Sequence, residues 1–350
     1  MRRARERGDS PRVIALRGTP AERGLSEMLG ASVAGPVAKH PARFRRSDGL
    51  RLAAHVARHR RPGELIHAHL PWPDRLGVAL LARVRAPLLV TFQLLPSHDI
   101  LGLGDAVLAP LLDLRRAAGL SSKLAPLIFT AVSEEDARRL RETFTGIRVE
   151  RVYNCPSAAT GPAPPPLPFG SGIRLFAVGQ LSHRKGFDRL LRALGSEPAR
   201  SHSFSFCIAG EGDERQALAG LAAELGLQDR VRFVGRVPAP HLYAQADLFL
   251  SGSRAEGLPL VLLEAMAAGI AVAVSDIPAH REGVAGIPEA LLDADDRNWP
   301  AQLARLLAES GLRQAIADRA KQRAELHFSA RAQDQAFCGL YRELADASRR

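Results

Sequence analysis

The sequence has few cysteines and no long hydrophobic run. Three cysteines occur among 350 residues, and their spacing fits neither disulfide pairs nor a zinc site. The apolar runs, such as residues 258–263, fall far short of the roughly 20 residues that a membrane-spanning helix needs. Residues 1–23 are rich in arginine and lack the apolar core of a secretion signal. We therefore expect a soluble protein of a reducing compartment, the cytoplasm.

Aromatic residues are also scarce, at 5%, whereas positive charge is abundant and unevenly placed. Residues 1–158 hold 26 Lys and Arg against 15 Asp and Glu, and residues 159–350 hold 22 of each. This excess fits an arginine-rich solvated surface, attraction to an anionic membrane, or nucleic-acid binding. Because aromatic residues do not alternate with the basic ones, we expect no nucleic-acid partner. The other two interpretations stay open, the second with the protein peripheral at the inner face of the cytoplasmic membrane.

A proline-rich segment divides the chain. Residues 156–172 contain six prolines, three glycines and no charged residue, so they can form neither a helix nor a central strand. On both sides of this linker, short apolar runs alternate with helical patterns, which predicts parallel βαβ units. We therefore expect an α/β fold with two doubly wound, Rossmann-like domains and a ligand cleft between them. The expected parts are a first domain over 1–155, the linker over 156–172, a second domain over 173–328, and a C-terminal helix over 329–350 that can cross back to the first domain.

The expected elements follow from these patterns. The predicted strands are 13–16, 65–70, 87–92, 127–132, 148–154, 173–179, 203–209, 231–234, 247–250 and 270–275. The predicted helices are 75–85, 134–144, 186–194, 213–225, 259–268, 299–308, 313–328 and 330–347. In residues 1–60, no glycine-rich turn follows the single predicted strand.

The most informative segment is residues 246–264. An apolar helix is predicted to begin there, with Pro259 at its first helical position and Gly269 at its C-terminal cap. The amide groups at the start of a helix point outward without partners, and they attract anions. Those near Gly257, Leu258 and Leu260 are therefore expected to form a diphosphate site.

Two carboxylates flank the start of this helix. Glu264 is the only polar side chain among its apolar residues, and burying an unpaired carboxylate costs several kcal/mol. Either sugar hydroxyls or protein groups would satisfy it. Glu256 lies eight positions earlier, which places the two carboxylates roughly 10–12 Å apart by helical rise. That separation suits one contact to a transferred sugar and one to a nucleotide ribose.

Two other loops follow predicted strands. The loop after Gly179 carries Arg184 and Lys185, and cations beyond a strand end can neutralise a leaving diphosphate. A solvated basic turn would look the same. The segment 206–212 ends in Gly210 and Gly212, which would let the backbone approach a nucleotide closely, although a lone Gly-x-Gly is a weak signal.

In their order along the chain, the segments VGQLSHRKGFDRLL, IAGEG, VRFVGRVP and LYAQADLFLSGSRAEGLPLVLLEAMAAGIAVAVSDIPAHREGV resemble the donor domain of family-4 glycosyltransferases, retaining enzymes of GT-B fold. The resemblance is strong over residues 173–285 and weaker over 64–154. It implies that the domain over 1–155 binds the acceptor and that the domain over 173–328 binds the nucleotide sugar. It implies transfer of a hexose from a nucleotide diphosphate sugar to a saccharide or lipid-linked acceptor, with retention of anomeric configuration, in cell-surface polysaccharide or lipopolysaccharide synthesis. It also implies that neither a metal nor a cofactor is required.

The resemblance assigns roles to individual residues. Glu256 would contact the donor sugar, Lys185 would hold the diphosphate, and Glu264 would bind the ribose hydroxyls. His67 and His69 are expected to point to opposite faces of one strand, with His69 on the acceptor side. The full donor set is Gly179, Gln180, Arg184, Lys185, Gly210, Gly212, Arg236, Gly257, Leu258, Leu260 and Glu264, with Glu256 and Lys185 catalytic and with His69 and Gln93 on the acceptor side.

Three departures from the family pattern keep an alternative open. Gln180 stands where the family commonly has arginine, so one phosphate cation is lost unless Arg184 replaces it. Gln93 stands where the family commonly has histidine, and the glycine-rich loop of the first domain is not recognisable. The alternative is a catalytically impaired GT-B protein that acts as a sugar-nucleotide-binding or scaffold subunit.

Overall fold

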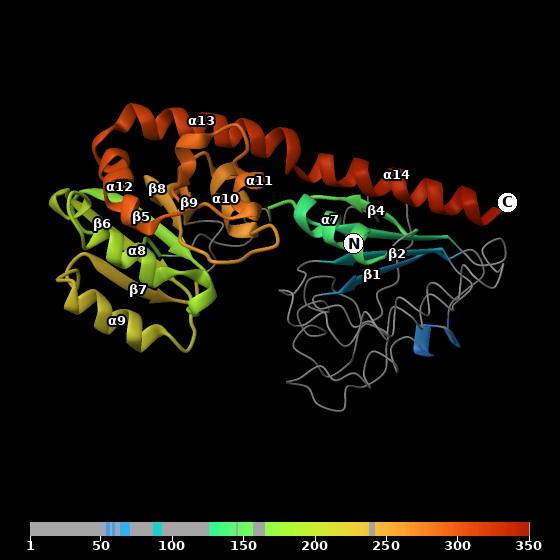
Figure 1. The fold of residues 1–350 in the computed structure, drawn as a ribbon, viewed down its shortest axis with the longest axis horizontal. Helices are drawn as coiled ribbons and strands as arrows, with labels where there is room; N and C mark the ends of the chain where they lie inside the picture. Colours follow the sequence, from blue (N-terminus) through green and yellow to red (C-terminus); the bar gives the residue numbers. More distant parts are fainter. Residues whose placement is uncertain are drawn as a thin grey trace. The chain divides into compact units, whose positions relative to one another are not determined.

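The computed structural model describes residues 54–56, 58–59, 64–70, 87–92, 126–144, 146–156, 165–237 and 242–349. The described residues fall into two compact units (Figure 1). The first unit holds those up to Ala131 together with 136–150 and 338–349, and the second holds 132–135 and 151–337.

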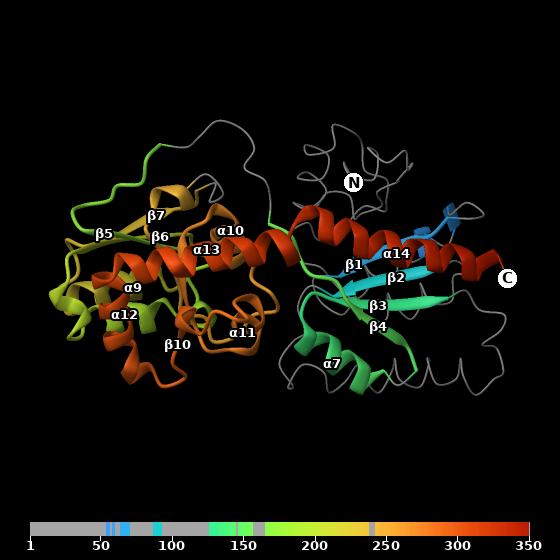
Figure 2. The same ribbon diagram turned by 90° about the horizontal axis from the view of Figure 1, so that it is seen from above.

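The first unit contains a four-stranded sheet in the order β1-β2-β3-β4. Strands β1 (Ile66–Leu70), β2 (Leu88–Phe92) and β3 (Leu127–Ala131) pair in parallel. Helix α7 (Glu134–Thr143) leads into β4 (Arg148–Arg151). The end of helix α14 (Ala330–Arg349) lies along this sheet in both views (Figures 1 and 2), where Tyr341 is hydrogen-bonded to His67.

The second unit contains a six-stranded sheet in the order β10-β9-β8-β5-β6-β7, and its paired strands are parallel. Its strands are β5 (Ile173–Val178), β6 (Phe204–Ala209), β7 (Val231–Gly235), β8 (Leu248–Ser251), β9 (Ala271–Ser275) and β10 (Leu291–Leu292). Its helices are α8 (Phe187–Leu194), α9 (Arg215–Glu224), α10 (Leu260–Ala268), α11 (Pro278–Gly283), α12 (Trp299–Ala308) and α13 (Ser310–His327), and α14 begins in this unit.

The strand order reverses between β5 and β8. From β5 the chain moves through β6 to β7 on one side, and then returns to β8 and continues through β9 to β10 on the other. Because parallel crossovers are right-handed, the two directions place their helices on opposite faces of the sheet. The helix contacts agree, since α8 touches α9, whereas α10 touches α13. The loops that follow β5 and β8 therefore start side by side.

The described elements match most of the sequence predictions within a few residues, and three details differ, one of which is that the short strand β10 was not predicted. Gly269 caps α10 in the left-handed conformation with a φ of 72°, which confirms that prediction. The placement of Pro259 at the first helical position is wrong, because its ψ of 115° is extended and the helix begins at Leu260. The short helix α11 was not predicted.

The end of the proline-rich segment belongs to the second unit and does not form a separate linker there. The amide of Leu167 donates to the Gln245 side chain at 2.8 Å, and the amide of Gly170 donates to Ser205 Oγ at 2.8 Å. The part of the second unit that contains this segment begins at residue 151. Residues 157–164, the predicted helix 75–85 and the predicted strand 13–16 lie outside the described residues.

Gly210 offers a test of this packing. Its φ is 137°, and a Cβ built on it would lie 1.8 Å from the carbonyl oxygen of Gly179. We expect Gly210→Ala to lower the free energy of unfolding by more than about 1 kcal/mol, because it forces the loops after β5 and β6 apart. The control is Gly220→Ala within α9, where a Cβ meets no atom within 4 Å. It should raise the free energy of unfolding by about 0.5–1 kcal/mol. Urea unfolding measures both, and equal stabilities would contradict this packing.

Candidate functional site

The candidate site lies where the strand order reverses. In doubly wound sheets, ligands bind at the carboxyl ends of the strands on either side of such a reversal. Here those strands are β5 and β8. The loop after β5 contains the short 3-10 helix η2 (His183–Lys185), and the loop after β8 leads to α10. The predicted residues Arg184, Lys185 and Glu256 all lie on these two loops.

Two glycines bring the loops into backbone contact. Gly186 has a φ of 62°, and a Cβ on it would lie 1.9 Å from the carbonyl oxygen of Gly252. A Cβ on Gly252 would lie 2.4 Å from the carbonyl oxygen of Gly186. Only glycine fits at either position, because any side chain would force the loops apart.

Arg254 ties the same loops together. Its amide donates to the carbonyl of Arg184 at 2.8 Å, and its guanidinium donates to the carbonyl of His183 at 2.7 Å. Two further bonds of 2.8 Å join the guanidinium to the carboxylate of Asp188 on α8. One side chain on the β8 loop therefore holds the start of α8 and the β5 loop in place.

Arg189 supports the β8 loop from α8. Its guanidinium donates to the carbonyl of Gly252 at 2.9 Å and pairs with Asp296. It also stacks over the ring of the buried Trp299, with 4.3 Å from its central carbon to the ring centroid. A cation held by a carbonyl, a carboxylate and an aromatic face is fixed in position.

Glu256 is the centre of the site, and its side chain is only 7% exposed. Oε1 accepts a bond of 2.6 Å from Lys185 Nζ and one of 2.8 Å from Ser253 Oγ. Oε2 accepts a bond of 2.8 Å from Arg184 Nη1. Burial alone would raise the pKa of Glu256, but the charge and hydrogen bond of Lys185, the charge of Arg184 and the bond from Ser253 outweigh it and lower the pKa. Glu256 is therefore ionised at neutral pH.

The two cations exceed the charge of the carboxylate that they share. Lys185 is 15% exposed and Arg184 is 41% exposed, so both ends remain accessible beside Glu256. Arg184 also donates to the carbonyl of Ala255 at 2.9 Å. Gln180 is exposed just beyond β5, near Gly179, which packs against the Lys185 side chain. The arrangement leaves a net positive charge at the reversal point, which suits an anion.

Glu264 meets a protein donor. It lies on α10 and accepts a bond of 2.8 Å from the hydroxyl of Tyr243, which is fully buried. Burial and the nearby charge of Glu264 both raise the pKa of Tyr243, so the hydroxyl stays protonated and donates. The sequence left open whether sugar hydroxyls or protein groups satisfy Glu264. The structure shows a protein partner, Tyr243.

The start of α10 is displaced from its predicted place. Gly257 and Leu258 are buried, whereas Leu260 is 42% exposed. The carbonyl of Pro259 accepts the first helical bonds from Leu262 and Leu263. The amides of Leu260 and Val261 precede these bonds, so the end of α10 that attracts anions begins at Leu260.

Gly210 and Gly212 serve a contact between loops. A Cβ on Gly212 would lie 2.2 Å from the carbonyl oxygen of Leu181, just as one on Gly210 would strike Gly179. The glycines thus let the loop after β6 pack against the loop after β5. Arg236 is exposed just after β7.

The acceptor-side histidines need a correction. Residues two apart on a strand point to the same face, so the expectation that His67 and His69 point to opposite faces was wrong in its premise. His67 is the satisfied histidine, with its ring nitrogens 2.7 Å from Tyr341 Oη and 2.7 Å from Thr91 Oγ1. The side chain of His69 and the whole of Gln93 lie outside the described residues.

Sequence reasoning missed a buried polar cluster beside Glu256. His280 on α11 lies next to three serines that lead to the carboxylate, Ser251, Ser253 and Ser275. These residues lie inside the segment that carried the resemblance. A single histidine and scattered serines have no spacing that distinguishes them from ordinary loop residues, so no sequence pattern identified them.

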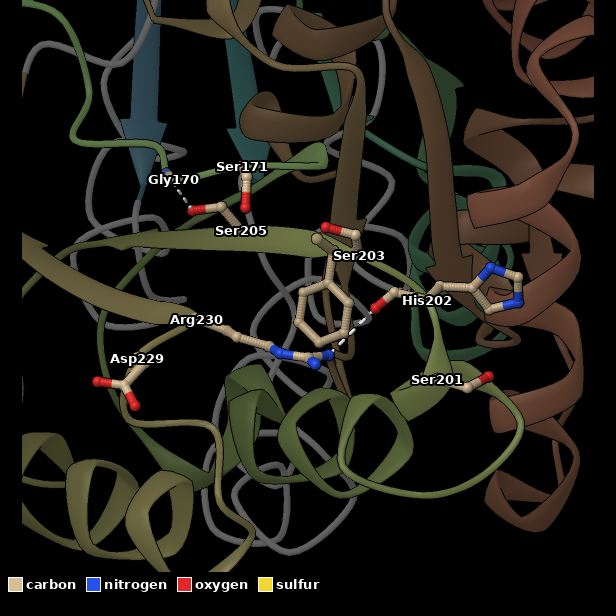
Figure 3. A pocket seen from close by; sticks show the side chains of 9 residues that line it. Gly170, Ser171, Ser201, His202, Ser203, Ser205, Asp229 and Arg230 are labelled. Atoms are coloured by element: carbon tan, nitrogen blue, oxygen red, sulfur yellow. Dashed lines mark hydrogen bonds between the residues drawn. The ribbon is translucent and has the colours of Figure 1, made fainter.

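A hollow of about 230 Å³ lies at the opposite ends of the strands from the candidate site (Figure 3). Its lining residues come just before β5, β6 and β7 or from the start of β6, so the hollow lies at the amino ends of these strands. Arg230 points along it, but its Nη1 already donates to the carbonyls of Arg200 and His202. The lining residues are Gly170, Ser171, Ser201, His202, Ser203, Phe204, Ser205, Asp229 and Arg230.

Part of the chain is similar to a known protein family, and its fold is similar to that of solved structures. Residues 167–323 match the family model described as Glycosyl transferases group 1. The crystal structure of Anabaena HepE in complex with UDP and glucose matches with a TM-score of 0.66 and 20% identity, covering 92% of this chain and 89% of that one. The chain has the GT-B fold. The donor residues predicted from sequence all lie within its group 1 region.

Relatives in sequence match part of the chain. A D-inositol 3-phosphate glycosyltransferase from Thermobispora bispora is 38% identical over 158 residues, which cover 40% of this chain and 36% of that protein. An O-antigen biosynthesis glycosyltransferase from Escherichia coli is 35% identical over 112 residues, covering 32% of this chain and 31% of that protein. The chain thus spans about a third of the length of these relatives. Among the described helices, none is both long and apolar enough to cross a membrane.

The ion pair at Glu256 predicts a pH-dependent stability. Because folding lowers the pKa of Glu256, its ionised form stabilises the fold above its ordinary pKa of 4.5, and this contribution is lost as the pH falls through the lower, folded pKa. We expect Glu256→Gln to cost about 1–3 kcal/mol at pH 7 and progressively less below the ordinary pKa. Urea unfolding of both proteins from pH 7 to pH 3 measures this, and a difference that does not change with pH would contradict it.

Proposed function

We propose that this protein is a glycosyltransferase that moves a hexose from a nucleotide diphosphate sugar to a hydroxyl of a saccharide or lipid-linked acceptor, with retention of anomeric configuration. The observation that carries the proposal is the cluster of Lys185, Arg184 and Glu256 at the strand-order reversal between β5 and β8. The Anabaena structure of the same fold, bound to UDP and glucose, supports this choice of donor.

The donor diphosphate would lie against Lys185 and Arg184. As the bond between the anomeric carbon and the phosphate oxygen breaks, negative charge grows on the leaving diphosphate. The two cations and the first amides of α10 would stabilise that charge. Because these groups supply positive charge, we propose that the reaction is independent of metal, as in the family-4 enzymes that the sequence resembles.

The two glutamates would orient the donor. Glu256, ionised and held by Ser253, would accept hydrogen bonds from hydroxyls of the transferred sugar, and Glu264 would accept them from the ribose beside Tyr243. The acceptor oxygen then bonds to the anomeric carbon on the face that the phosphate leaves. The acceptor proton passes to an oxygen of the leaving phosphate, so no enzyme carboxylate needs to attack.

The remaining donor-side residues have lesser roles in this proposal. Gly179 lies against the stem of Lys185, and Arg184 replaces the cation that Gln180 does not supply. Exposed Leu260 is the first residue of α10. Arg236 follows β7, which is separated from β5 by β6 in the sheet.

Transfer from a panel of radiolabelled nucleotide sugars tests the reaction. We expect Lys185→Ala to lower kcat by about 10²–10³-fold, since it removes a donor to the developing charge. The matched control is Arg192→Ala, which removes an exposed cation from the last turn of α8 and should change kcat little. A chelator should leave turnover unchanged.

Calorimetric titration with uridine, guanosine and adenosine diphosphates separates the enzyme from the scaffold alternative. Glu264→Ala should weaken the preferred nucleotide if Glu264 binds the ribose. Nucleotide binding without turnover of any sugar would favour the scaffold subunit, and absence of binding would contradict both.

The basic residues 1–158 suggest where the acceptor lies. We propose that this part attracts an anionic membrane surface, where each nearby Lys or Arg contributes about 1 kcal/mol. The relative named for O-antigen biosynthesis supports a role in cell-surface polysaccharide synthesis. The protein should sediment with anionic liposomes at low salt and be released at high salt, because salt screens exposed charges. Binding that does not respond to salt, or no binding, would refute this attraction.

A further inference from the structure

His280 is a buried ionisable side chain to which the proposed mechanism gives no role. It lies on α11, just beyond β9, and is 0% exposed. Burial lowers the pKa of His280 to about 4, so the imidazole is neutral near pH 7. The nearby charges are Glu256 on the β8 loop, Lys185 on the β5 loop and Arg189 on α8. Two of these three are cations, which disfavours a charged His280.

Hydrogen bonding determines the tautomer of His280. Nδ1 lies 2.8 Å from the carbonyl oxygen of Ser275 and 3.1 Å from its hydroxyl. A carbonyl oxygen can only accept, so in the neutral ring Nδ1 carries the hydrogen. Nε2 is then an acceptor, 3.5 Å from Ser251 Oγ. The imidazole is thus anchored at the end of β9 through Nδ1.

From Ser275 the bonds continue to the catalytic carboxylate. The Ser275 hydroxyl donates to the carbonyl of Ser253 at 2.6 Å, and the Ser253 hydroxyl donates to Glu256 Oε1 at 2.8 Å. Ser253, Ser275 and His280 are each at most 1% exposed. These short, buried hydrogen bonds join β9 to the β8 loop and end on Glu256. Because water does not compete for the buried groups, the carboxylate has few alternative hydrogen-bonding arrangements.

We propose that His280 is a positioning residue for Glu256. Its Nδ1–H bond holds Ser275, the Ser275 hydroxyl fixes the Ser253 backbone, and the Ser253 hydroxyl then aims the Glu256 carboxylate at the donor sugar. This inference rests on the proposed function, in which Glu256 orients the transferred sugar. A loss of alignment at Glu256 should slow transfer while leaving the diphosphate contacts of Lys185 intact.

Two variants interrupt the bonds at different points, and a third retains them. His280→Leu removes both ring nitrogens at similar volume, and Ser275→Ala removes the middle hydroxyl. His280→Asn places an amide nitrogen near the position of Nδ1, so it can still donate to the Ser275 carbonyl. The matched control is Ser205→Ala. Ser205 is also buried and accepts a hydrogen bond of 2.8 Å from the amide of Gly170, but it lies near the amino end of β6, away from the candidate site.

The first readout does not need turnover. In protein labelled with ¹³C at the glutamate side-chain carboxyl carbon, the Glu256 signal is the one that disappears in Glu256→Gln. We expect the pKa of Glu256 to rise in His280→Leu and Ser275→Ala, because the bond from Ser253 that helps to lower it is weakened. It should stay unchanged in His280→Asn and Ser205→Ala.

The second readout is kinetic. In His280→Leu, kcat should fall on the order of tenfold or more, whereas the Kd of the preferred nucleoside diphosphate should change by less than about twofold. His280→Asn should recover most of kcat. A merely structural role would lower kcat and raise the Kd together, and it would not distinguish asparagine from leucine.

The outcomes separate the two proposals. If the wild type transfers no sugar, the proposed function fails, while the titration of Glu256 still tests the positioning. If Glu256 titrates alike in the wild type, His280→Leu and Ser275→Ala, the positioning role is overturned even in an active enzyme. It is also overturned if His280→Asn behaves like His280→Leu. Should His280→Leu fail to fold, Ser275→Ala against Ser205→Ala gives the same decision.

Discussion

The backbone contact between Gly186 and Gly252 is the constraint on which the candidate site depends. Gly186 directly follows Lys185, and Gly252 lies on the loop that carries Glu256. Any side chain at either glycine would separate the loops, and a separation of even 1 Å would stretch the bond of 2.6 Å between Lys185 and Glu256 beyond a normal hydrogen bond. Arg254 and Arg189 fasten the same two loops through backbone carbonyls. The strand-order reversal brings the loops near one another, and these contacts align them.

The electrostatics follow from this packing. A carboxylate that is 7% exposed stays ionised only because Lys185, Arg184 and Ser253 supply donors, which together outweigh the cost of burial. The result is a rigid anion with a surplus of positive charge at its accessible side. Lys185 and Arg184 can exchange Glu256 for a diphosphate, because phosphate oxygens are anionic hydrogen-bond acceptors, as the Glu256 carboxylate is in the free protein. In our proposal, His280 positions the Glu256 carboxylate through Ser275 and Ser253, and because it is neutral it adds no charge to the site.

Much of the fold was predictable because buried parallel strands are continuous apolar runs, as residues 204–209 of β6 illustrate. Lys185, Arg184 and Glu256 were predictable because they follow such strands directly. Long-range contacts were not. The Gly186–Gly252 contact depends on how two distant loops pack, and the glycines at 210 and 212 were assigned to a ligand although their side-chain positions face another loop. The six residues of α11 are too few for a helical period, so His280 and its serines had no pattern that could reveal them.

The most direct measurement is a crystal structure of the protein with a bound nucleoside diphosphate. The account predicts phosphate oxygens within hydrogen-bond distance of Lys185 Nζ and Arg184, next to the first turn of α10, with the ribose beside Glu264 and Glu256 still bonded to Ser253. A nucleotide bound elsewhere, such as in the hollow near Arg230, with the Lys185–Glu256 pair closed and unchanged, would contradict it.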